Sequence, residues 1–319
     1  MRLSLSKSPN ETPCFQKHIS DYLHHLSTQR KLSPNTIYHY RVDLQQLQQF
    51  IHTLNTLNSI TPSDIRKWAS QLHAQGITPR SIARKLSTCR GFFAWLIEQN
   101  ALAINPATGV KSPKHVKTLP TTLSTDDAVH LVSTGAHNTA TKQCDHAIYE
   151  LLYSSGLRIS ELVGLDYLYT QTKTYQSMGW LDMDTQEVIV TGKGNKMRRV
   201  PVGAAALQAL TAWLSVRSTL LKHDPLPLFL TRRGTRISPR LIQLRIKAHA
   251  QKIGLPTNVH PHMLRHSFAT HVLQSSGDLR AVQEMLGHAS ITATQIYTAL
   301  DFQHLAHIYD ATHPRAQKK

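Results

Sequence analysis

The chain has 319 residues, 40% of them hydrophobic, which is enough to build two compact domains with their own cores. Thirty-six lysines and arginines against nineteen aspartates and glutamates give a formal net charge of +17 at pH 7, which favours nucleic acid as a partner over an anionic membrane surface. No run approaches the roughly 18 consecutive apolar residues of a membrane-spanning helix, and the N-terminus carries no apolar signal region, so we expect a cytoplasmic protein that binds no membrane.

The N-terminal part shows helical patterns with apolar residues on one face, over about residues 15–26, 34–51, 62–75 and 79–100. Pro34 and Pro62 stand at first helical positions, each after a serine or threonine that can serve as an N-cap. The last of these helices has basic residues available on its outer side: Arg80, Arg84, Lys85 and Arg90. We therefore predict a small four-helix domain with a basic face in residues 1–107.

The segment that follows breaks the helical pattern with prolines, a glycine and lysines, and we interpret residues 108–118 as an interdomain linker. This basic linker is either a solvated tether or a segment that follows a phosphate backbone, and the sequence leaves both open. From residue 119 onward helical signals dominate, with helix starts at Pro239 and Pro261. Residues 187–202 form two β-branched runs around a Gly-Lys-Gly-Asn turn, which predicts a β-hairpin. The fold class expected is therefore mainly α with a small β-sheet.

Residues 260–271 contain four histidines and one arginine, so a metal site has to be weighed against a phosphate site. His262 and His266 share a helix face, but Met263 stands where a zinc protease has glutamate, and Arg265 would repel a divalent ion beside them. His271 falls on the apolar side of the helix, which favours a packed, structural histidine. His262 and Arg265, at positions i and i+3, instead present two donors to one phosphate. The three cysteines are isolated and suggest no zinc site either.

Three other segments have the same phosphate-binding character. Arg158 follows a glycine at an expected helix start, Lys193 lies between two glycines in the hairpin turn, and residues 286–298 hold a Gly-His pair and a tyrosine. Together these segments resemble those of the tyrosine recombinases, the phage integrase family. The residues that match that family's catalytic set, in the family's order, are Arg158, Lys193, His262, Arg265, His288 and Tyr297.

The resemblance spans nearly the whole chain. It implies an N-terminal SAM-like core-binding domain and an α+β catalytic domain in residues 119–319 that ends in a tail helix. Segments such as 32–36 and 275–280, together with the tail, are similar to the bacterial Xer recombinases, and the tail is most similar to the XerC group. The family then implies a nucleoid-associated enzyme that resolves chromosome dimers at cell division. It also implies double-stranded DNA with a dif-like site, a XerD-like recombinase in a heterotetramer, and an FtsK-like DNA translocase as partners.

The chemistry can also be read from the residues. Arg158 and Arg265 can each donate to nonbridging phosphate oxygens, and neutral imidazoles at His262 and His288 can accept or donate a proton. Tyr297 would then attack as a phenolate and form a 3′-phosphotyrosyl intermediate, with Lys193 as the acid for the 5′ oxygen. Because side-chain cations neutralise the phosphate and the covalent bond conserves its energy, we expect no cofactor, metal ion or ATP.

Some alternatives stay open at this stage. Tyr309 is a rival nucleophile, although no Gly-His precedes it, and Lys196, Arg198 and Arg199 compete with Lys193 for contact with DNA. We assign Glu161 an orienting role. The segment 166–183 is longer than the family's usual connection, which predicts an extra loop or a longer strand. The alternative functions are an integrase or transposon recombinase that acts alone, and a DNA-architectural protein without catalysis.

Overall fold

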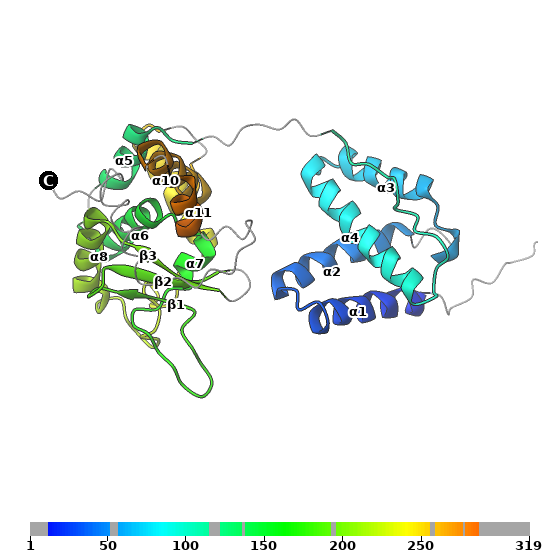
Figure 1. Ribbon diagram of the computed structural model, residues 1–319, viewed down its shortest axis with the longest axis horizontal. Coiled ribbons are helices and arrows are strands. Elements are labelled where there is room, and N and C mark those ends of the chain that lie inside the picture. The colour runs from blue at the N-terminus through cyan, green and yellow to red at the C-terminus, as the bar shows by residue number, and fades with distance from the viewer. Residues whose placement is uncertain are drawn as a thin grey trace, which may run out of the picture. The chain divides into compact units, whose positions relative to one another are not determined.

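The structure is a computed structural model, which describes residues 12–51, 57–114, 122–135, 138–192, 196–255, 259–276 and 278–286. The chain divides into two compact units, Met1–Thr118 and Leu119–Lys319 (Figure 1). The described helices of the first unit are α1 (Thr12–Thr28), α2 (Pro34–Ile51), the 3-10 turn η1 (Leu57–Ser59), α3 (Pro62–Ala74) and α4 (Pro79–Glu98). None of the helices in the described ranges is long and apolar enough to cross a membrane.

The starts of these helices follow from local side-chain chemistry. At α3, the hydroxyl of Thr61 accepts from the backbone N–H of Asp64, whose carboxylate accepts from the backbone N–H of Thr61 at 3.0 Å. Thr78 accepts from the N–H of Ser81 in the same way at α4. Such a cap satisfies a donor that the helix leaves unpaired and contributes about 1 kcal/mol. The helix starts predicted at Pro34 and Pro62 are confirmed.

The predicted outer side of α4 is wrong at one residue. Lys85 is buried, and its Nζ donates to Asp43 Oδ1 at 2.9 Å and to Gln46 Oε1 at 2.6 Å. Arg84 also donates to Asp43, through Nη2 at 3.0 Å, but it remains partly exposed. Asp43 is fully buried on α2, so these two cations compensate a carboxylate that would otherwise be too costly to bury.

The second unit contains more helices and the sheet: α5 (Thr125–Ser133), α6 (Ala140–Ser155), α7 (Ile159–Val163), β1 (Gly179–Asp182), β2 (Glu187–Thr191), β3 (Met197–Pro201), α8 (Ala204–Arg217), α9 (Pro239–Lys252), α10 (Pro261–Ser276) and α11 (Leu279–Leu286). The strands form an antiparallel sheet in the order β1-β2-β3. The prediction of a mainly α chain with a small β-sheet is confirmed, as is the hairpin formed by β2 and β3.

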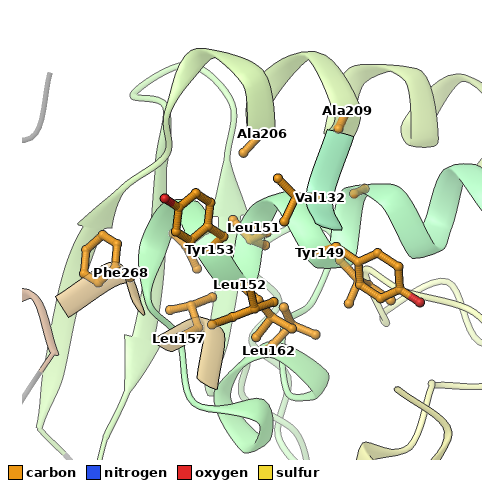
Figure 2. Packing of buried hydrophobic residues seen from close by; sticks show 14 of the residues in the cluster. Val132, Tyr149, Leu151, Leu152, Tyr153, Leu157, Leu162, Ala206, Ala209 and Phe268 are labelled. Atoms are coloured by element: carbon orange, nitrogen blue, oxygen red, sulfur yellow. The ribbon is translucent and has the colours of Figure 1, made fainter. Parts of the chain in front are cut away.

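Helix α6 runs through the core of this unit. It is buried from Ala147 to Ser155 and packs against α5, α8 and α10. Figure 2 shows Leu151, Leu152 and Tyr153 among the buried side chains of this core, which include Ala206 and Ala209 of α8 and Phe268 of α10. This part of α6 is buried on all sides, including the polar residues Glu150, Ser154 and Ser155, so it lies at the centre of the unit. The buried C-terminal end of α6 leads directly into the candidate site.

The long segment before the sheet forms a loop. β1 begins only at Gly179, and the residues before it fold back in a short pairing of Gln171 with Gln176. Buried Asp166 anchors the base of the loop, because it accepts from the Tyr175 hydroxyl at 2.6 Å and from Arg236 Nη2 at 2.5 Å. Of the two alternatives predicted for this segment, the extra loop is the one observed.

Candidate active site

Arg158 stands at the turn between α6 and α7. Gly156 ends α6 with φ of +55°, and a Cβ at this position would lie 2.4 Å from a ring carbon of Phe268, so the turn requires glycine. Arg158 then takes an extended conformation as the N-cap residue of α7. Its backbone N–H donates to Glu161 Oε2 at 2.8 Å and its Nη1 donates to Glu161 Oε1 at 2.9 Å. One glutamate therefore starts the helix and holds the arginine.

Arg265 reaches the same point from α10. Its Nη1 donates to the carbonyl of Gly156 at 2.5 Å, its Nη2 donates to the carbonyl of Leu286 at 2.6 Å, and its Nη1 lies 3.9 Å from Glu161 Oε2. The structure thus brings Arg158 and Arg265 together around Glu161, although more than a hundred positions separate them in the sequence. A guanidinium has five N–H donors, so the two bonds to carbonyls leave Arg265 donors for a further acceptor.

A third arginine completes the cluster. Arg198 of β3 donates from Nη1 and Nη2 to the two oxygens of Glu161, each at 2.9 Å, and from Nε to the carbonyl of Met285 at 3.0 Å. The side chain is only 12% exposed, which is less than the 31% of Arg158. From the sequence, Arg198 was one of three basic residues that could contact DNA in place of Lys193. Strand alternation would have revealed its inward direction, because Val200, two positions on, is fully buried.

The charged groups around Glu161 shift one another's pKa values. Burial disfavours the charged form of Glu161, but the hydrogen bonds and charge of Arg198, followed by the bonds from Arg158, hold the pKa of this carboxyl below its usual value. Burial and then the charge of Arg158 lower the pKa of Arg265 to about 10. Arg265 therefore remains protonated at neutral pH. Three guanidinium groups and one carboxylate leave a local net charge of +2, which suits an anionic ligand.

His262 is exposed, one turn before Arg265 on α10. Partial burial of its ring and the nearby charges of His260, His266, Arg265 and Arg158 lower its pKa from the usual value. The neutral imidazole is therefore favoured at pH 7. A neutral imidazole can accept a proton and donate a hydrogen bond from the other ring nitrogen, which fits the role predicted for His262.

His271 belongs to the interior, as the sequence predicted. Its Nε2 lies 3.2 Å from the carbonyl of Leu123, and its Nδ1 lies 3.0 Å from the hydroxyl of Tyr153. The carbonyl can only accept, so Nε2 carries the proton and Nδ1 accepts from Tyr153. Within the described ranges, no group of three or more His, Cys, Asp or Glu residues could hold a metal ion.

Three predicted site residues, Lys193, His288 and Tyr297, lie outside the described residues, as does the rival Tyr309. The structure describes the chain close to the first two. The N–H of Gly192 donates to the carbonyl of Lys196 at 2.8 Å, so the two described residues on either side of positions 193–195 are hydrogen-bonded to each other. Leu286, whose carbonyl Arg265 holds, precedes His288 by two positions.

The chain matches the Phage integrase family over residues 121–304 and the phage integrase N-terminal SAM-like domain over residues 19–100. It is 51% identical over 310 residues to the tyrosine recombinase XerC of Ralstonia pickettii (strain 12J), with 94% of each chain covered. It is 46% identical over 301 residues to the XerC of Pseudomonas aeruginosa (strain PAO1), covering 93% of this chain and 95% of the relative.

Solved structures share the fold. The XerH site-specific recombinase bound to a palindromic difH substrate has a TM-score of 0.68 at 20% identity, covering 97% of this chain and 99% of that one. A lambda integrase dimer bound to a COC' core site has a TM-score of 0.65 at 15% identity, covering 88% and 98%. The predicted resemblance is confirmed, and so is the enzyme class: the chain belongs to the phage integrase family of tyrosine recombinases, and it is a site-specific enzyme that cleaves and rejoins DNA strands.

Proposed function

We propose that the chain is a recombinase of the XerC type that resolves chromosome dimers at cell division through a 3′-phosphotyrosyl intermediate and a Holliday junction. The observation that carries the proposal is the meeting of Arg158 and Arg265 around one carboxylate, with a local excess of positive charge. An arginine pair of this kind suits the nonbridging oxygens of a phosphodiester, since planar guanidinium groups donate in pairs.

The proposed roles of these residues account for the cleavage of one DNA strand. The phenolic oxygen of Tyr297 attacks the phosphorus, the P–O5′ bond breaks, and the 5′ oxygen takes a proton from Lys193. His262 and His288 accept the proton of the tyrosine or donate to the phosphate, and the lowered pKa of His262 favours the form that accepts. Arg158 and Arg265 stabilise the extra negative charge of the transition state, each by about 3 kcal/mol.

Strand exchange is the reverse reaction with a new 5′ hydroxyl. Attack of that hydroxyl on the phosphotyrosine restores the phosphodiester and frees Tyr297. The proposed reaction therefore needs neither ATP nor a metal ion. The two halves of the chain would share the DNA, with the four-helix unit as the core-binding part. The exposed basic residues of α4, such as Arg80 and Arg90, would supply phosphate contacts, which are largely independent of sequence.

The partners follow from the same proposal. The curated relatives are named XerC, and the XerH structure holds difH DNA. We therefore expect a dif-like site in the host chromosome, a XerD-like recombinase in a tetramer of two chains of each kind, and activation by an FtsK-like translocase. The enzyme would work on the nucleoid, in the cytoplasm.

The test is a nicked suicide duplex that carries the dif-like site of the host chromosome. The nick lets the 5′ fragment diffuse away after cleavage, so the covalent protein–DNA product accumulates. We expect product from the wild type at the same rate with and without EDTA, and none from Tyr297→Phe. Tyr309→Phe is the matched control and should form product normally.

The outcomes separate the proposals. Product from Tyr297→Phe would place the nucleophile elsewhere, and loss of product in EDTA would make a metal ion part of the reaction. Strand exchange by this chain alone, on a plasmid with two sites and no second recombinase, would favour an integrase that acts without a partner.

A further inference from the structure

Among Arg158, Arg198 and Arg265, Arg198 donates the largest number of described hydrogen bonds to groups on other elements. Its two terminal nitrogens clasp both oxygens of Glu161 on α7, and its Nε donates to the carbonyl of Met285 near the end of α11. Arg198 itself belongs to β3. One guanidinium therefore links β3, α7 and the end of α11.

The strand forces this side chain inward. Arg198 pairs across the sheet with Val190, and both Val190 and Val200 are buried, so residues on this face of β3 are enclosed. A cation in that position costs several kcal/mol unless a counter-charge and hydrogen-bond acceptors receive it. Glu161 and the Met285 carbonyl supply both, so the direction of the side chain is fixed by its partners.

The geometry at Glu161 connects Arg198 with Arg158. Nη1 of Arg198 and Nη1 of Arg158 both donate to Oε1 of Glu161, each at 2.9 Å. The two parallel bonds from Arg198 fix the plane of the carboxylate, and that plane decides where Arg158 is held. A lysine could not reproduce this, because an ammonium group is a point donor without a planar fork.

The charge balance gives Arg198 a second effect. With Arg198 present, Glu161 has a bidentate counter-ion that is 12% exposed. Without it, Glu161 would depend for its charge compensation on Arg158 and on Arg265, whose Nη1 already lies 3.9 Å from Oε2. Both arginines would then be drawn from the phosphate towards the carboxylate, and the local charge would fall from +2 to +1.

We propose that Arg198 is a positioning residue of the cleavage reaction, which holds Glu161 and the end of α11 so that Arg158 and Arg265 face the scissile phosphate. The inference rests on the catalytic roles proposed above for those two arginines. It predicts that Arg198 affects the rate of cleavage much more than the affinity for DNA, because its donors point to protein groups.

The experiment measures single-turnover cleavage of the nicked suicide duplex by the full chain, at rising protein concentrations. Arg198→Gln should lower the saturating rate by about 30-fold or more, and the half-saturating concentration should change by less than about 3-fold. Arg198→Lys keeps the charge but not the fork, and should still lose about 10-fold. Arg199→Gln is the matched control: it removes the same charge from the next residue, whose side chain is 58% exposed and pairs with Glu187.

A double-mutant cycle separates positioning from general damage. If Arg198 acts through Glu161, Arg198→Gln combined with Glu161→Gln should cleave no more slowly than the slower single variant. Multiplied losses in the double variant, or a saturating rate for Arg198→Gln equal to that of Arg199→Gln, would overturn the inference. If thermal unfolding shows that Arg198→Gln does not fold, the saturating rate of Arg198→Lys becomes the test, and a rate equal to that of Arg199→Gln would overturn the inference. Failure of the wild type to form the covalent product, with the XerD-like recombinase also present, would instead refute the proposed function.

Discussion

Glu161 shows how one acidic residue can serve a site built for an anion. Three arginines surround it, and together they leave an excess of positive charge where a phosphate would bind. Because the pKa of Glu161 is held below its usual value, the carboxylate stays charged through the neutral range and keeps its arginines in place. The orienting role predicted for Glu161 from the sequence agrees with these contacts and stays a prediction until its variants are assayed.

Gly156 offers a test of the turn that presents Arg158. In Gly156→Ala the Cβ would meet the Phe268 ring at 2.4 Å and the backbone would keep a φ of +55°. The strain of the left-handed conformation costs about 1–2 kcal/mol, and the overlap with a packed ring adds about 1–3 kcal/mol. We expect the urea midpoint of the full chain to fall accordingly, and DNA cleavage to fall with it because Arg265 donates to the Gly156 carbonyl.

Gly254→Ala is the matched control for this prediction. Its φ of +78° imposes the same kind of strain, but a Cβ there would meet nothing within 4 Å. Gly254→Ala should therefore lose only the backbone contribution and cleave DNA normally. Equal losses of stability in the two variants would show that the Phe268 contact does not constrain the turn.

At the scale of the element, α4 carries a buried ion network that supports the first unit. Lys85→Met keeps the length of the side chain and removes the charge that faces Asp43. Asp43 would then be fully buried with Arg84 as its remaining cation, and we expect the free energy of unfolding to fall by about 2–4 kcal/mol. Calorimetry of the full chain measures this as an earlier transition.

Arg80→Met gives the comparison for Lys85→Met. It removes one positive charge from an exposed position of the same helix. The unfolding transition should move little, while DNA binding should weaken at low salt because an exposed phosphate contact is lost. If Lys85→Met unfolds no earlier than Arg80→Met, the network contributes nothing to stability.

Helix α10 makes the stability of the second unit depend on pH. Burial lowers the pKa of His271, since its ring is enclosed between Tyr153 and the Leu123 carbonyl. The unfolded chain then binds more protons than the folded one below about pH 6.5, so stability is full above that pH and is lost as the pH falls towards the lowered value. The slope for one such group reaches at most about 1.4 kcal/mol per pH unit.

The measurement is the urea midpoint of the full chain at several values between about pH 7 and pH 5. His271→Gln removes the titrating ring, so its midpoint should vary less steeply with pH than that of the wild type, whatever its stability at pH 7. His266→Gln, at an exposed position of the same helix, should keep the steep dependence. Identical slopes for the wild type and His271→Gln would contradict the assignment.

For the whole molecule, the sequence predicted what depends on local pattern. The helix starts at Pro34 and Pro62 and the hairpin follow from caps, alternation and turn residues near one another in the chain. For residues 166–183 the resemblance left a loop and a longer strand open, and the structure shows the loop. Lys85 was predicted wrongly because its partner Asp43 lies 42 positions away, and periodicity cannot show a buried carboxylate on another helix. The inward direction of Arg198 was missed, although the buried Val200 two positions on marks that face of the strand.

The candidate site shows the same division. The spacing of His262 and Arg265 predicted a phosphate site and the family resemblance added Arg158, and the structure brings Arg158 and Arg265 to one carboxylate. The bonds from Arg265 to the carbonyls of Gly156 and Leu286 could not be predicted, because they depend on how α10 packs against the ends of α6 and α11. Lys193, His288 and Tyr297 lie outside the described residues, and their roles stay predictions.

The most direct test of the central claim identifies the residue that becomes joined to DNA. The covalent product of the wild type and the suicide duplex is digested with protease and nuclease, and the peptide that retains a 3′-phosphoryl nucleotide is sequenced by mass spectrometry. We predict that the modified residue is Tyr297 and that Arg158→Gln and Arg265→Gln each reduce the yield of this peptide by about 100-fold or more. A nucleotide on Tyr309 or another residue, or an undiminished yield from both arginine variants, would contradict the account.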